Sequence, residues 1–128
     1  MTPPPSVEAA LASAVENLAG ARELHANRHH AMAISRAYYA TLYASMALLA
    51  SVGMHGKTHD GVRSLVNLHF VRTGKLSAET SVHLGSLEGA RIQADYDLAA
   101  VFTADGTLAL IERAQSYVDE VTALIAPA

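Results

Sequence analysis

The hydrophobic positions of this chain recur at the three- and four-residue spacing of helices that bury one face. This spacing predicts five helices, and no segment alternates at every second residue as a half-buried strand would. Their expected bounds are about 6–26, 29–52, 58–72, 77–98 and 103–125. Because long amphipathic helices with short connections are typical of up-and-down bundles, we expect an all-α fold in a single domain over residues 1–128.

The residues at the expected helix ends agree with this interpretation. Four residues that can accept hydrogen bonds from the first amides of a helix precede the segments: Ser6, Thr58, Ser77 and Thr103. Gly53 and Gly74 follow the second and third segments, where a left-handed glycine commonly ends a helix. The prolines before Ser6 predict a flexible tail over residues 1–5.

The fourth predicted helix carries an arginine on its apolar face. That face consists of Leu84, Leu87, Arg91, Ala94 and Leu98. A guanidinium keeps its proton and is costly to bury without a partner, so its position needs a reason. Asp95 lies four residues further on, about 40° round the same face. The spacing therefore predicts an Arg91–Asp95 pair, which is either structural or part of a reactive site.

Composition narrows the class of protein. The chain has 128 residues, of which 51% are hydrophobic and 16% are charged, as expected of one globular domain. It has no cysteine, which excludes disulfides and thiolate metal sites and fits a reducing cytoplasm. The start lacks the pattern of a signal peptide, and the most apolar segment, residues 37–52, is too short and too polar to span a membrane. We therefore expect a cytoplasmic protein.

The net charge of −3 conceals an uneven distribution. Residues 24–75 carry six basic groups against one acid and hold six of the seven histidines, whereas residues 76–128 carry two basic groups against eight acids. A basic middle can offer a local surface for phosphate in a protein that is not basic overall. An uneven but merely solvated surface explains the pattern equally well.

The second predicted helix places tyrosines beside an arginine. Arg36, Tyr39 and Tyr43 share one face, because seven residues make nearly two full turns. Such tyrosines can stack on the arginine, hydrogen-bond a phosphate or line a dimer surface. Alternatively, Tyr38 and Tyr39 are half-buried core residues whose hydroxyls reach the rim.

The histidines suggest two further sites. Two pairs have the spacing that lets imidazoles share an ion on a helix: His25 with His29, and His55 with His59. No third ligand stands near either pair in the sequence, so we expect no metal. Lys57, His59 and Arg63 surround the start of the third helix, where they could form an anion site or a solvated cap. The common sequence signatures of enzymes are missing.

Four segments together resemble the HEPN domain family, in its branch of small stand-alone proteins. They are residues 35–40, 57–62, 69–76 and 91–96, and the resemblance spans roughly 30–98. The resemblance implies a helical bundle that dimerises and works beside a minimal nucleotidyltransferase in toxin–antitoxin or defence pairs. Many members are metal-independent ribonucleases. In these, an arginine and a histidine a few residues further on, frequently followed by a tyrosine, form a composite site across the dimer.

By this resemblance, Arg91 takes the position of the arginine that would hold the scissile phosphate. The position of the family's histidine holds Asp95 or Tyr96, and no histidine follows His83. Arg63 and His69 also have the motif spacing, but they lie in the wrong helix, and we treat that match as chance. The expected site therefore consists of Arg91, Asp95 and Tyr96, with rim contacts from Arg36, Tyr39, Lys57 and His59.

The sequence leaves three functions open, none of which requires a cofactor. The first is a ribonuclease with a degenerate motif, in which Asp95 or Tyr96 would have to move the proton. The second is a non-catalytic module, in which the Arg91–Asp95 pair is structural and the cleft serves a nucleotide or the nucleotidyltransferase. In the third, that partner modifies a hydroxyl group, and Tyr96 is the first candidate.

Overall fold

The computed structural model describes residues 4–126, and its regular elements are all helices. They are α1 (Val7–Ala26), α2 (His30–Ala50), α3 (His59–Val66), the π-helical turn η1 (Asn67–Val71), α4 (Ala78–Tyr96) and α5 (Ala104–Ile125). The predicted all-α class is confirmed. None of these helices combines the length and the apolar character needed to cross a bilayer. Of the expected flexible tail, residues 1–3 lie outside the described residues.

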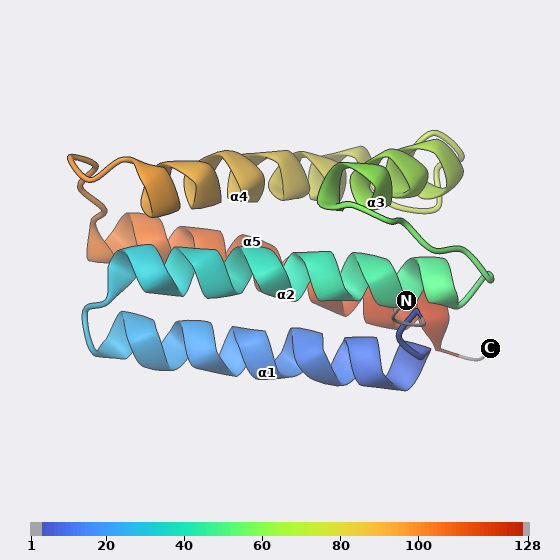
Figure 1. Cartoon of the computed structure of the whole chain (residues 1–128), viewed down its shortest axis with the longest axis horizontal. Helices are drawn as coiled ribbons and strands as arrows, with labels where there is room; N and C mark the ends of the chain where they lie inside the picture. The colour runs from blue at the N-terminus through green and yellow to red at the C-terminus, as the bar shows by residue number, and fades with distance from the viewer. Residues whose placement is uncertain (1–3, 127–128) are drawn as a thin grey trace.

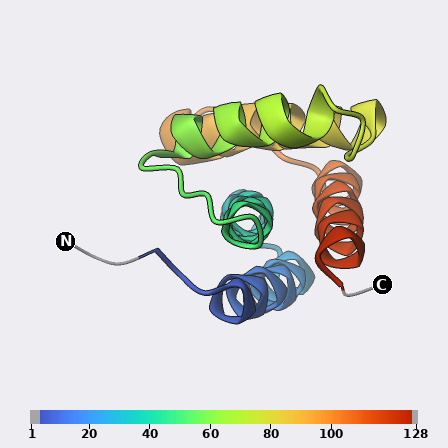
Figure 2. The ribbon, with the colours of Figure 1, turned by 90° about the vertical axis from the view of Figure 1, so that its right-hand side faces the viewer.

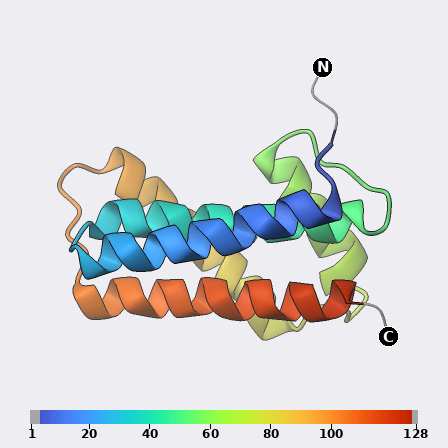
Figure 3. The ribbon, with the colours of Figure 1, turned by 90° about the horizontal axis from the view of Figure 1, so that it is seen from below.

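Helix α2 forms the centre of the bundle. It packs against α1, α3, α4 and α5, and Figure 2 shows it end-on with the other helices around it. Helices α1, α2 and α5 run side by side (Figure 1), whereas α3 and α4 cross them obliquely on one side (Figure 3). In α2, 13 of 21 residues are buried, as expected of a helix that is apolar on nearly every side. Its many alanines allow the neighbouring helices to approach closely.

The predicted helix caps are confirmed. Each of the four expected N-cap side chains accepts a hydrogen bond from the backbone amide three residues later: Ser6, Thr58, Ser77 and Thr103. Gly53 and Gly74 both have positive φ, at 75° and 77°. The local sequence therefore fixes where the helices begin and where the chain can turn.

Three helix ends differ from the prediction. Helix α4 ends at Tyr96, before the expected end near residue 98. Helix α2 ends at Ala50, two residues early, where the hydroxyl of Ser51 donates to the carbonyl of Leu48 and the chain turns towards Gly53. The third segment is α-helical only to Val66 and continues as η1. In η1 the turn widens, and the amide of Arg72 donates to the carbonyl of Asn67, five residues back.

A buried polar contact joins α2 to α5. The Tyr117 hydroxyl lies 2.5 Å from the Ser45 hydroxyl, which itself donates to the carbonyl of Thr41 at 2.9 Å. All three residues are almost fully buried. Burial raises the pKa of Tyr117 to about 12, so the phenol stays protonated and donates to Ser45. The Tyr117 hydroxyl thus depends on Ser45 for its hydrogen bond, whereas the Ser45 hydroxyl also donates to Thr41.

Because Tyr117 needs Ser45 more than Ser45 needs Tyr117, the two single variants should differ in stability. Ser45→Ala leaves the Tyr117 hydroxyl buried without an acceptor and should lower the free energy of unfolding by roughly 1–3 kcal/mol. Tyr117→Phe leaves Ser45 bonded to Thr41 and should cost about 1 kcal/mol or less. Urea unfolding followed by circular dichroism measures both. Equal losses, or a larger loss for Tyr117→Phe, would contradict the assignment.

Candidate functional site

Arg91 lies in the second half of α4 and faces α2. Its side chain is only 14% exposed, and its guanidinium carbon lies 4.9 Å from the centre of the Tyr38 ring. Tyr38 comes from the middle of α2 and is 1% exposed, so the ring is a fixed part of the core. Stacking on this ring explains how the apolar face of α4 accommodates a permanent cation.

Asp95 holds the other side of the guanidinium. Its Oδ2 accepts from Nη1 of Arg91 at 3.4 Å, and its Oδ1 accepts from the hydroxyl of Ser35 at 2.5 Å. The predicted Arg91–Asp95 pair is therefore present, and Ser35 anchors it to α2. No spacing in the sequence links positions 35 and 95, so the role of Ser35 could not be predicted. With both carboxylate oxygens engaged, Asp95 orients Arg91.

The contact with Asp95 engages only part of the Arg91 guanidinium. Among the described residues, only Asp95 accepts a hydrogen bond from Arg91, and the buried Nε has no partner. Burial tends to lower the pKa of Arg91, but the hydrogen bond to Asp95 and the nearby Tyr38 and Tyr39 hydroxyls outweigh it, so the pKa is raised. The result is a fixed positive charge with unused donors, which suits an anion.

His59 reaches the same tyrosine from a third helix. It is the first residue of α3, and its Nδ1 lies 3.5 Å from the hydroxyl oxygen of Tyr38. Its ring also meets that of Tyr39 edge-on, with centroids 5.9 Å apart. Burial, together with repulsion from the Glu88 carboxylate, raises the pKa of Tyr38 despite the opposing charge of Arg91. The Tyr38 hydroxyl therefore stays neutral beside His59.

Two further cations flank this cluster. Arg36 on α2 lies over the ring of Tyr39, 4.8 Å from its centre, and donates to the side chain of Asn17 at 3.2 Å. Lys57 is exposed in the loop just before α3. In the described part of the chain, neither cation forms an ion pair with a carboxylate. Their role as rim contacts stays a prediction.

Tyr96 and Arg63 lie apart from this arrangement. Tyr96 ends α4 with 75% exposure and, five residues from Arg91, is turned well away from it along the helix. Arg63 pairs with the carboxylate of Glu88 on α4 and so does not complete an anion site with Lys57 and His59. The α3–α4 pairing joins distant positions, which helical spacing alone cannot reveal.

Besides a hollow of about 560 Å³ between α1 and α2, which Arg36 and Tyr43 line, two hollows lie near the helices of this cluster. One, of about 330 Å³, is bordered by Ser35, Arg36 and Asp95 together with apolar residues of α1, α2 and α4: Leu24, Ala31, Met32 and Ala94. The other, of about 370 Å³, lies under α3 and η1 with Tyr117 among its lining residues. Neither Arg91 nor Tyr38 lines either of these two hollows, but the first is bordered by Ser35 and Asp95, which hold the Arg91 guanidinium in place. Within residues 4–126, no three histidines or carboxylates come close enough to hold a metal ion.

Comparisons with known proteins show the family of this chain. A UPF0332 protein of Thermotoga maritima is 31% identical over 86% of this chain and 83% of its own length. A protein of Methanocaldococcus jannaschii named "Putative toxin" is 30% identical over 90% of this chain and 85% of its own. The family model for the HEPN domain matches residues 7–125, from the start of α1 to the end of α5. The chain therefore belongs to the HEPN domain family.

Proposed function

We propose that this protein is the HEPN member of a toxin–antitoxin or defence pair and cleaves RNA at a cleft centred on Arg91. The observation that carries the proposal is the Arg91 guanidinium, which is held on Tyr38 by Asp95 while most of its donors are unused. A phosphodiester offers the acceptors that such a group binds best. The name of the Methanocaldococcus jannaschii relative supports the toxin class.

In this proposal the cations have separate roles. Arg91 neutralises the charge that develops on the phosphate while the neighbouring 2′-hydroxyl attacks it. Arg36 and Lys57 attract the flanking phosphates, and Tyr39 offers a face on which an unpaired base can stack. No metal ion and no cofactor takes part.

The proposal also includes a second copy of the chain, a partner and a compartment. Exposed apolar residues gather at the end of α4 and in the loop after it: Ile92, Tyr96, Leu98 and Val101. Exposed apolar side chains so close together in the chain suit a protein interface. We assign it to a homodimer in which two Arg91 residues approach one another. A minimal nucleotidyltransferase is the proposed partner, and the cytoplasm is the proposed location.

One observation favours a second candidate function, a non-catalytic binding module. Asp95 is engaged through both oxygens and Tyr96 is turned away, so neither residue at the position of the family's histidine is placed to move a proton. In this version the Arg91–Asp95 pair stabilises the contact between α2 and α4. The cleft then serves a nucleotide or the nucleotidyltransferase.

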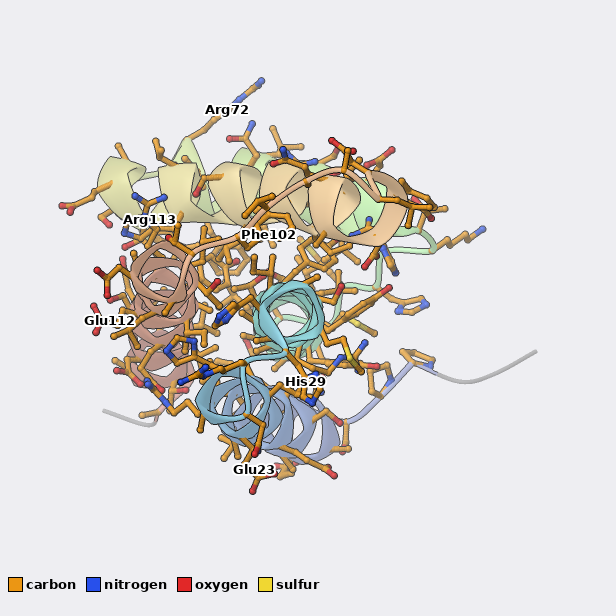
Figure 4. All side chains as sticks on the ribbon, turned by 90° about the vertical axis from the view of Figure 1, so that its left-hand side faces the viewer. Glu23, His29, Arg72, Phe102, Glu112 and Arg113 are labelled. Carbon is orange, nitrogen blue, oxygen red and sulfur yellow. The ribbon has the colours of Figure 1, made fainter. Side chains whose placement is uncertain are left out.

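Replacing Arg91 tests the ribonuclease proposal. Arg91→Ala should lower the rate of RNA cleavage by on the order of 10²–10³-fold, the usual effect of removing one donor to developing charge. Arg72→Ala is the matched control, because Arg72 is exposed and projects away from the bundle (Figure 4). Cleavage of labelled RNA measures the rate, and circular dichroism checks that each variant is folded.

Equal cleavage by the wild type and Arg91→Ala would contradict the proposal. A pull-down separates the two candidate functions when cleavage is absent. If RNA is not retained while a nucleotidyltransferase co-purifies, the protein is the binding module.

The exposure of Tyr96 leads to a further prediction about the partner. Because its hydroxyl is accessible and its side chain is 75% exposed, Tyr96 can enter the active site of a nucleotidyltransferase. Incubation with the partner and ATP should add nucleotidyl groups to the wild type and not to Tyr96→Phe, as intact mass spectrometry would reveal. Tyr43→Phe serves as the control, because Tyr43 lies on α2 and is partly buried against the core. Equal modification of Tyr96→Phe would refute this role.

A further inference from the structure

We propose that His59 is the proton-transfer group of this site, so that a histidine from α3 replaces the one that α4 lacks. This inference rests on the proposed ribonuclease function and adds a catalytic residue to it. In the sequence, His59 stands 32 positions before Arg91, and nothing in their spacing connects them. The connection comes from the packing of α3 and α4 against the same part of α2.

Arg91 and His59 both contact one buried ring. The guanidinium carbon lies 4.9 Å from the centre of the Tyr38 ring, and the His59 ring centre lies 6.2 Å from it. The Tyr38 hydroxyl reaches the imidazole Nδ1 at 3.5 Å, a length that hydrogen bonds in unliganded sites often have before they tighten. A phosphate held by Arg91 is therefore placed on the same side of α2 as the imidazole.

The other ionisable groups around His59 are unsuited to proton transfer near neutral pH. Glu88 on α4 pairs with Arg63, and Asp95 is bound by Arg91 and Ser35. Lys57 and Asp60 lie beside His59 in the chain, and both are exposed. On α2, burial raises the pKa of the Tyr38 phenol, which therefore stays protonated near neutral pH. Imidazole is the one side chain here that ordinarily changes charge between pH 5 and 8.

The orientation of the imidazole follows from its neighbours. Because the Tyr38 hydroxyl is neutral, it can accept a hydrogen bond from Nδ1–H in both charge states of the ring. Nε2 of the exposed His59 is then free to face the substrate. Close packing also fixes the loop that leads into α3. A Cβ on Gly56 would come within 2.7 Å of the Val62 backbone nitrogen, so this glycine lets the loop pack directly on α3.

The proposed cleavage of the phosphodiester needs no reagent other than water. The proton of the ribose 2′-hydroxyl passes to Nε2 of His59 as the 2′ oxygen forms a bond to phosphorus. The bond between phosphorus and the 5′ oxygen breaks, and that oxygen leaves with the electron pair and takes a proton from water. The imidazolium then gives its proton to the hydroxide so formed. The products are a 2′,3′-cyclic phosphate and a 5′-hydroxyl end.

His59→Gln, with His55→Gln as its control, tests the inference in the full chain. Both histidines are exposed, and only His59 contacts the tyrosines, so both variants should fold. His59→Gln should lower the cleavage rate by roughly 10²–10⁴-fold while the affinity for RNA stays nearly unchanged. The wild-type rate should fall as the pH is lowered through the imidazole range, and His59→Gln should lose this dependence. His55→Gln should behave as the wild type.

The Tyr38→Phe variant adds a second test, because it keeps the ring under Arg91 and removes only the hydroxyl. Its cleavage rate should fall less than that of His59→Gln, since the imidazole remains but is less well oriented.

These experiments test the role of His59 separately from the proposed ribonuclease function. If the wild type cleaves RNA and His59→Gln cleaves equally well, His59 has no catalytic role and the ribonuclease proposal stands. A loss of RNA affinity that matches the loss of rate would make His59 a binding contact and would overturn the proton-transfer role. If the wild type cleaves no RNA, both fail.

Discussion

The contact between Arg91 and Tyr38 is the interaction on which the rest of the site depends. A permanent cation on the apolar face of α4 would destabilise the bundle if nothing compensated it. The Tyr38 ring supplies a polarisable surface, and Asp95 supplies a counter-charge that is itself held by Ser35. The same contacts join α4 to α2, so the fold and the position of the charge are determined together.

This arrangement explains why the site spans three helices. Helix α2 is buried on nearly every side and gives a rigid centre, from which the Tyr38 ring meets Arg91 of α4 and the partly buried Tyr39 lies beside it. Helix α4 provides Arg91, and α3 begins with His59 against both tyrosines. Helix α2 positions the aromatic rings against which Arg91 and His59 pack.

Local features of this molecule followed from its sequence, and contacts across the bundle did not. The four N-caps, the turns at Gly53 and Gly74 and the Arg91–Asp95 pair all depend on residues within a few positions of one another. Helical spacing is sufficient to predict such features. Ser35–Asp95, Arg63–Glu88 and Tyr38–His59 join different helices, and their pairing depends on crossing angles that the spacing does not contain.

In the proposed site, Arg91 and His59 face the same phosphate. The most direct test is a nuclear magnetic resonance titration of the full chain with a short RNA that carries 2′-O-methyl groups and so cannot be cleaved. We expect the Nε–H signal of Arg91 and the ring signals of His59 to shift together, with one dissociation constant, while the signals of Arg72 and His55 stay in place. If only the signals of other arginines shift, and those of Arg91 and His59 do not, then Arg91 and His59 do not bind a common phosphate.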